Sequence, residues 1–156
     1  MLAQVSTLAG HLLPRIYGAA ISAAGDLAAA SVVLAQADEA LGDTPACIPC
    51  SVGFLLAAAT CCAHAADLDR AGSYVERASD VAGMWGEGAW TAGVAEARGE
   101  VFIARTEPEK AVPLLWEAAD LFGGAGQPLD EARCRVRAEE ISSRKPPRKD
   151  RGRTAP

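Results

Sequence analysis

The sequence predicts an all-α helical-repeat domain, built from three helix–turn–helix hairpins and a terminal capping helix. Three observations lead to this fold class. The chain of 156 residues contains 34 alanines, and alanine is the strongest helix former. Half of the residues are hydrophobic but only 5% are aromatic, which favours closely packed helices over a β-sheet. A pattern of small and bulky residues also recurs about every 40 residues, as expected for a repeat protein.

The repeat is clearest in three segments that align without gaps: 25–37, 66–78 and 106–118. These segments start 41 and then 40 residues apart. Alanine occupies their sixth and thirteenth positions, which are seven residues apart and therefore share one face of a helix. The alanines are Ala30, Ala71, Ala111, Ala37, Ala78 and Ala118. We expect them to pack in the core that neighbouring hairpins share.

The same alignment predicts the helices in order. We expect first helices at 14–24, 51–65 and 91–105, second helices at 27–41, 68–82 and 107–122, and a last helix at 128–143. A short leading helix over 2–12 should end before Pro14, because proline interrupts a helix.

The turns between these helices contain residues that are typical of helix ends. Asp26 and Asp67 are predicted N-caps. Thr106 and Glu109 have the spacing of a capping box, and Pro108 lies in the first turn between them. Glycines at equivalent positions are predicted to be the C-caps of the second helices: Gly42, Gly83 and Gly123.

The charge is divided unevenly along the chain. Residues 1–140 carry 9 Lys or Arg and 19 Asp or Glu, a balance of −10, whereas residues 141–156 carry 6 and 1, a balance of +5. We therefore predict a helical domain over 1–143 and a basic, disordered tail over 144–156. The sequence shows neither a transmembrane segment nor a signal peptide, so we expect a cytoplasmic protein with reduced thiols and no membrane partner.

These residues resemble the tetratricopeptide repeat (TPR), a helix–turn–helix unit that stacks into a right-handed superhelix. The family pattern of a small and then a bulky residue in the first helix is matched by Gly18 and Ile21, Ala59 and Cys62, and Gly99 and Phe102. The period of 40–41 residues is longer than the family's usual 34. It is similar to the repeats of large bacterial LuxR-type ATP-binding transcriptional regulators. This sequence contains no phosphate-binding G-x-x-x-x-G-K-[ST] motif.

The resemblance implies a non-catalytic module that binds a protein or peptide partner in a concave groove lined by the first helices. No catalytic residues, metal or cofactor are predicted. The repeat register predicts the following partner-binding residues: Arg15, Ser22, Thr60, His64, Glu96, Glu100, Ile103, Arg133 and Arg137. Exposed stacking surfaces at the two ends of the repeat array would also permit a homodimer.

Two other functions stay open on the sequence alone. The chain could be a fragment or relative of a bacterial transcriptional regulator whose basic tail contacts nucleic acid. It could also be a small zinc or redox protein that uses Cys47 and Cys50, which have the spacing C-x-x-C. Cys61 and Cys62 are adjacent on a predicted helix and point about 100° apart, so both are not expected to reach one metal ion.

Overall fold

The computed structural model describes residues 7–42 and 47–143, and within these ranges all regular structure is helical. The seven helices are α1 (Thr7–Ser22), α2 (Leu27–Leu41), α3 (Ile48–His64), α4 (Leu68–Gly83), α5 (Ala89–Ala104), α6 (Pro108–Gly124) and α7 (Pro128–Ser143). The predicted basic tail, 144–156, lies outside the described residues. Among those residues, no helix is both long and apolar enough to span a membrane.

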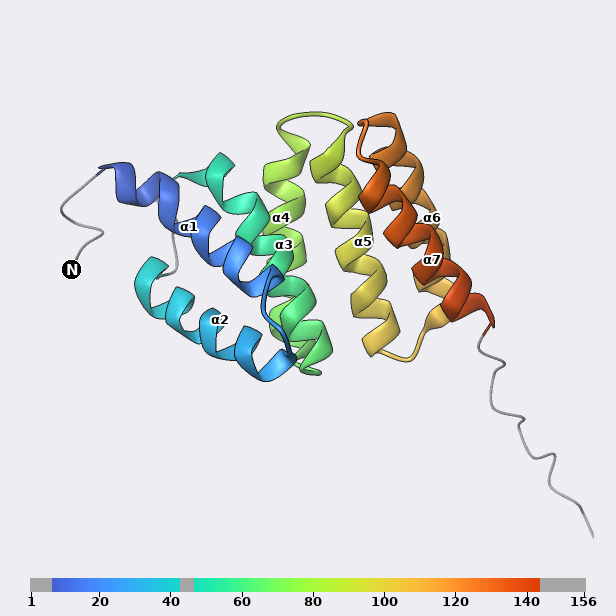
Figure 1. Ribbon diagram of the computed structural model, residues 1–156, viewed down its shortest axis with the longest axis horizontal. Helices are drawn as coiled ribbons and strands as arrows, with labels where there is room; N and C mark the ends of the chain where they lie inside the picture. The colour runs from blue at the N-terminus through green and yellow to red at the C-terminus, as the bar shows by residue number, and fades with distance from the viewer. Residues whose placement is uncertain (1–6, 43–46, 144–156) are drawn as a thin grey trace, which may run out of the picture.

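The helices stack as consecutive packed pairs (Figure 1). The pairs are α1 with α2, α3 with α4, and α5 with α6, and α7 packs against α6 at the end of the stack. The first helices are also neighbours, since α1 packs on α3 and α3 on α5. The prediction of an all-α helical-repeat fold is therefore confirmed.

The repeated small residues form the centres of the packing contacts. Every alanine at the sixth and thirteenth repeat positions is buried, with at most 7% of its surface exposed. Gly18 lies so close to α3 that a Cβ atom added there would be 2.8 Å from the backbone nitrogen of Phe54. Gly99 lies two repeats further along the chain, and a Cβ atom added there would be 3.1 Å from the side chain of Leu115 in α6. Small residues thus set the close approach of the helices.

The prediction that a leading helix ends before Pro14 is wrong. Helix α1 runs without a break from Thr7 to Ser22 and contains Pro14. The ring of Pro14 is among the most completely buried side chains of the protein. Burial of this apolar ring offsets the backbone hydrogen bond that proline cannot donate.

The predicted N-caps Asp26 and Asp67 are confirmed. The carboxylate of Asp26 accepts a hydrogen bond from the backbone N–H of Ala29 at 2.8 Å, and that of Asp67 accepts one from Arg70 at 3.4 Å. The predicted capping box is wrong, because Glu107 is the N-cap residue of α6 and its side chain makes no capping bond.

The helix C-termini follow a motif that differs from the predicted one. Gly42 caps α2 with φ of 60°, as expected, but Gly83 and Gly123 are still helical. Left-handed residues instead end α3, α5 and α6: Ala66, Thr106 and Gly126. In each case the residue after the left-handed one donates its backbone N–H to the carbonyl oxygen five residues before it, which is the hydrogen bond of a Schellman motif. Ala66 and Thr106 are one repeat apart, so the turns repeat with the same period as the core residues.

The N-terminal end of the stack leaves an apolar stripe exposed on α1. Leu8, Leu12 and Ile16 are spaced four residues apart and are 62%, 42% and 58% exposed. The homodimer that the sequence permits stays a prediction.

Candidate interaction groove

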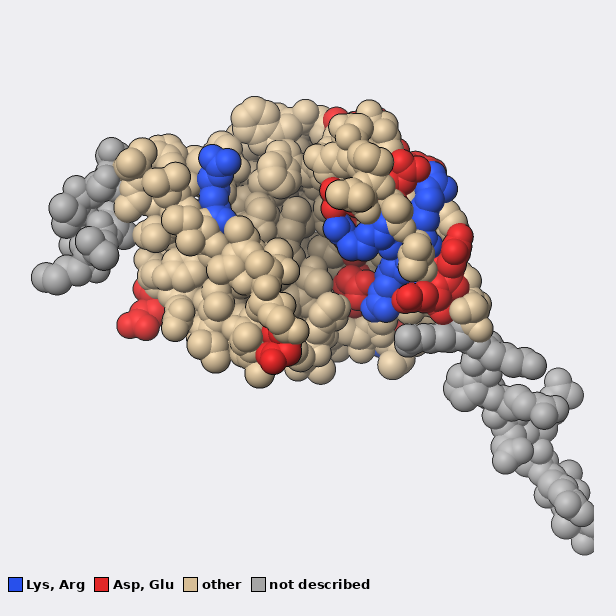
Figure 2. Space-filling model, in the orientation of Figure 1, with Lys and Arg blue, Asp and Glu red and all other residues tan. Residues whose placement is uncertain are grey.

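An open groove with a volume of about 1310 Å³ runs across one face of the stack. Most of its lining residues come from α1, α3, α5 and α7, the helices that occupy the first position of each unit. Figure 2 shows this face, which is mostly uncharged over α1 and α2, while charged side chains gather over α7. The groove therefore has two chemically different halves.

Seven of the nine predicted partner-binding residues line this groove. They are Ser22, Thr60, His64, Glu96, Glu100, Arg133 and Arg137. Arg15 lines a smaller hollow of about 410 Å³, which shares Ser22, Gly53 and Trp90 with the groove. Ile103 is partly buried in α5 and lies outside the lining of both. Whether these residues contact a partner stays a prediction.

The half of the groove formed by α1, α2 and α3 is mainly apolar. Ile21 and Leu27 line it from the first unit, and Leu56 and Ala57 line it from the second. Trp90 stands at the start of α5 with 44% of its surface exposed. A partly exposed tryptophan in a hollow is the kind of residue that most often anchors a bound protein segment.

The opposite half has a charged wall in which α7 is joined to α5. The guanidinium of Arg133 donates two hydrogen bonds to the carboxylate of Glu96, at 2.9 and 2.8 Å. Arg133 also donates to Asp130 in its own helix. Such two-pronged arginine–carboxylate contacts fix the orientation of both side chains. They hold the wall in shape before any partner binds.

Glu100 is the centre of the second contact across this wall. Arg137 donates to its two carboxylate oxygens at 2.8 and 3.0 Å, and Nε2 of His64 lies 3.2 Å from Oε2. Glu100 therefore connects α3, α5 and α7, and only 7% of its surface is exposed. Burial alone would raise its pKa, but the hydrogen bonds from His64 and Arg137 more than offset burial and lower the pKa to about 2.

This geometry gives Glu100 a structural role that the sequence does not reveal. Its carboxylate is engaged on both oxygens, so it is less accessible to a partner than Glu96 or His64. Because removal of one member of a buried ion pair is strongly destabilising, we expect substitution of Glu100 to weaken folding as well as any binding.

The charges of the groove do not cancel. Its lining contains five carboxylates and two guanidinium groups, which leaves a net charge of −3 if His64 is neutral. One of these carboxylates, Asp26, lies beside the apolar half at the start of α2. The other four belong to α5 and α7 and exceed the two arginines there by two, which leaves that half with a net charge of −2: Glu96, Glu100, Asp130 and Glu140. The groove thus combines an apolar half with an acidic half, and a complementary ligand would be apolar at one end and basic at the other.

The groove residues that the sequence-based prediction missed include Leu56 and Trp90. These residues lie in the middle of α3 and at the start of α5. Trp90 does have a signal in the sequence, since it follows a glycine-rich turn that also contains Trp85.

The three buried cysteines are packing residues, and Cys61 also reaches the lining of the groove. Cys61, Cys62 and Cys134 are buried among apolar residues, and burial raises the pKa of Cys62 to about 11 and of Cys134 to about 12. Buried structural thiols of this kind are inert, and this agrees with the core position that the repeat predicts for Cys62.

Comparison with known proteins adds no relationship to this description, because no protein-family model, curated protein or solved structure matches the chain.

Proposed function

We propose that the protein is a binding module whose groove holds a segment of a partner protein, with apolar side chains against α1–α3 and basic side chains against α7. The observation that carries the proposal is the two-part lining of the groove, in which Trp90 stands beside an apolar half and the other half has a net negative charge. The proposed function is binding alone, without catalysis of a reaction.

The acidic half supports a basic partner because of how its charges are arranged. Arg133 and Arg137 are already paired with Glu96 and Glu100. Asp130 and Glu140 share these two arginines. Glu140 lies 3.6 Å from Arg137 with its side chain 54% exposed, so its oxygen atoms can accept further hydrogen bonds. Lysine or arginine residues of a partner would be attracted there, and the attraction should weaken as salt is added.

The proposal includes a TPR-like relationship and a cytoplasmic, regulatory setting. Its support is the period of 40–41 residues in the core and in the turns, together with free cysteines at all five described positions. A regulator of the LuxR type would place an ATPase or a DNA-binding helix-turn-helix next to these repeats, and the neighbouring reading frames would show either one.

The test uses peptides selected from a random displayed library on the immobilised protein. We expect the selected peptides to combine an apolar stretch with a basic end. Their affinity would then be measured by fluorescence anisotropy for the wild type and two matched variants, Trp90→Ala in the groove and Trp85→Ala outside it. Trp85 is a suitable control because it is 60% exposed and lies in the turn just before α5, outside the lining of the groove.

We expect Trp90→Ala to weaken binding about 30-fold, which corresponds to about 2 kcal/mol for a tryptophan anchor. Trp85→Ala should leave the affinity within about twofold of the wild type. Equal losses in the two variants, or selected peptides with an acidic end, would contradict the proposal.

A further inference from the structure

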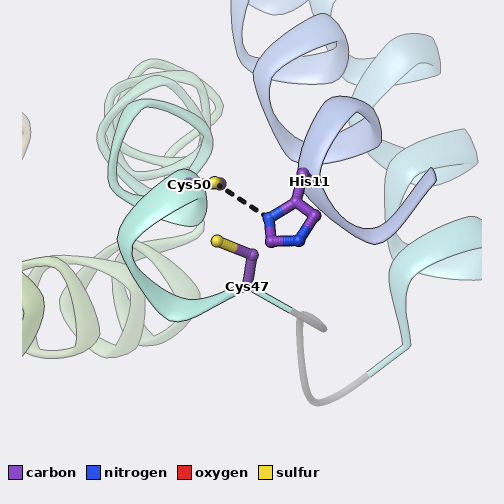
Figure 3. Close-up of side chains that lie close together, drawn as sticks. All are labelled: His11, Cys47 and Cys50. Atoms are coloured by element: carbon purple, nitrogen blue, oxygen red, sulfur yellow. Dashed lines mark hydrogen bonds between the residues drawn. The ribbon is translucent and has the colours of Figure 1, made fainter. Parts of the chain in front are cut away.

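Three potential metal ligands meet at the junction of α1 and α3, away from the charged wall. Cys47 is the N-cap residue of α3, and Cys50 lies in the first turn of the same helix. His11 comes from α1, 36 residues before Cys47, and its ring faces both thiols (Figure 3). The fold thus adds to the C-x-x-C pair a histidine that the sequence analysis did not connect with it.

The distances between these ligand atoms are close to those of a metal site. The two sulfur atoms and a ring nitrogen of His11 all lie within 4.8 Å of one another. Sγ of Cys50 and Nδ1 of His11 are 3.6 Å apart. In a tetrahedral zinc site with Zn–S of about 2.3 Å and Zn–N of about 2.0–2.1 Å, sulfur and nitrogen are about 3.6 Å apart and two sulfurs about 3.8 Å. Small side-chain rotations would therefore complete the geometry.

The environment of the pair differs from that of the other cysteines. Cys47 and Cys50 are only partly buried, whereas Cys61, Cys62 and Cys134 are buried in the cores. Cys50 lines the smaller hollow together with Arg15 and Pro49, and this hollow gives a route from solvent to the Cys50 thiol. A hydrogen bond with Cys47 and burial raise the pKa of the Cys50 thiol, and Arg15 opposes this rise to a smaller extent, so a bound metal ion would have to displace the proton.

We propose that His11, Cys47 and Cys50 bind a Zn²⁺ ion through two thiolates and one imidazole nitrogen, with a fourth position open toward the hollow. Two thiolates and an imidazole select zinc over magnesium or calcium, which prefer oxygen ligands. On binding, each thiol loses its proton to solvent, and no electron transfer takes place. The ion would tie α1 to α3 and so link the first hairpin to the second.

The test is a titration with Co²⁺ under reducing conditions, followed by displacement with Zn²⁺. Cobalt bound to thiolates gives a sulfur-to-metal charge-transfer band and visible bands typical of tetrahedral coordination. The variants are His11→Ala and the double variant Cys47→Ser with Cys50→Ser. Matched controls are His64→Ala, which removes the other histidine of the chain, and Cys61→Ser, which removes a thiol outside the site. Circular dichroism would verify that each variant is folded.

We expect one Co²⁺ per chain for the wild type and both controls, and a melting temperature that rises when Zn²⁺ is added. The double cysteine variant should lose the charge-transfer band. His11→Ala should keep both thiolates but bind at least about tenfold more weakly, since even loss of a residue that only supports a ligand weakens metal sites about 10–100-fold.

Three results would overturn the proposal. The first is binding of well below one Co²⁺ per wild-type chain with all thiols reduced. The second is equal affinity of His11→Ala and His64→Ala. The third is a charge-transfer band that persists in the double cysteine variant but disappears in Cys61→Ser.

Discussion

The approach of α1 to α3 at Gly18 gives a direct test of the packing argument. In Gly18→Ala, the new Cβ would lie 2.8 Å from the backbone nitrogen of Phe54 and 2.9 Å from its Cα. Both atoms belong to the backbone of α3, so a change of rotamer cannot relieve the contact. The two helices would have to move apart, and overpacking of this kind costs about 1–3 kcal/mol. We expect a value at the upper end, because the contact is with backbone.

Gly72→Ala in α4 is a matched control for this substitution. A Cβ at Gly72 would meet no atom within 4 Å. Both substitutions gain about 1 kcal/mol because alanine is the better helix former, so the difference between the two variants isolates the steric cost. Urea unfolding followed by far-ultraviolet circular dichroism measures it. We expect Gly72→Ala to be up to about 1 kcal/mol more stable than the wild type, and Gly18→Ala to be less stable by up to about 2 kcal/mol. Equal unfolding free energies of the two variants would refute the reasoning.

Three further predictions concern the turns, the charged wall and the second unit. Thr106 is a β-branched residue with φ of 60°, and Gly126 ends the next helix with the same motif and a φ of 73°. Thr106→Gly should therefore stabilise the fold by about 1 kcal/mol, and Gly126→Ala should destabilise it by a similar amount. Thermal unfolding should shift in opposite directions for the two variants, and a shift in the same direction would contradict the argument. Glu100 has a pKa of about 2 when folded and an ordinary value of 4.5, so the unfolded chain takes up its proton first as the pH falls. The stability that Glu100 provides is therefore complete at neutral pH and should fall by about 2 kcal/mol between about pH 7 and about pH 3. Glu100→Gln should flatten the dependence of the unfolding free energy on pH, and an unchanged slope would contradict the assigned pKa. The hydroxyl of Tyr74 donates to the carboxylate of Asp38 at 2.6 Å, so Tyr74→Phe should cost about 1–3 kcal/mol in urea unfolding; no loss would mean that the bond does not form in solution.

The sequence predicted the parts of the fold that depend on local and repeated features. The alanines at positions such as Ala71 and Ala111 are predictable because a small residue is needed wherever two helices cross in each unit. Asp26 and Asp67 are predictable because an N-cap acts within one turn of its own helix.

The sequence did not predict features in which long-range packing overrides a local preference. The burial of Pro14 against neighbouring helices keeps α1 continuous. Thr106 looked like an N-cap because glutamate follows three residues later, but the turn places it in a left-handed conformation instead. In both cases tertiary contacts determine the outcome, and the local pattern gives no measure of them.

The charged wall and the thiol–histidine cluster have different degrees of predictability. The spacing is 37 residues in both ion pairs, Glu96 with Arg133 and Glu100 with Arg137. This spacing is about one helical turn shorter than the repeat of 40–41 residues. The spacing therefore carries a signal for contact between successive first helices. His11 lies before the region in which the repeats align, so no periodicity connects it with Cys47 and Cys50.

The central claim is that the face lined by the first helices holds the partner. The most direct test is to map the binding of a selected peptide by NMR, using backbone amide shifts of the labelled protein. We predict that the largest shifts fall on α1, α3, α5 and α7, and include the amide of Trp90. Shifts concentrated on α2, α4 and α6, with the groove residues unchanged, would contradict the claim.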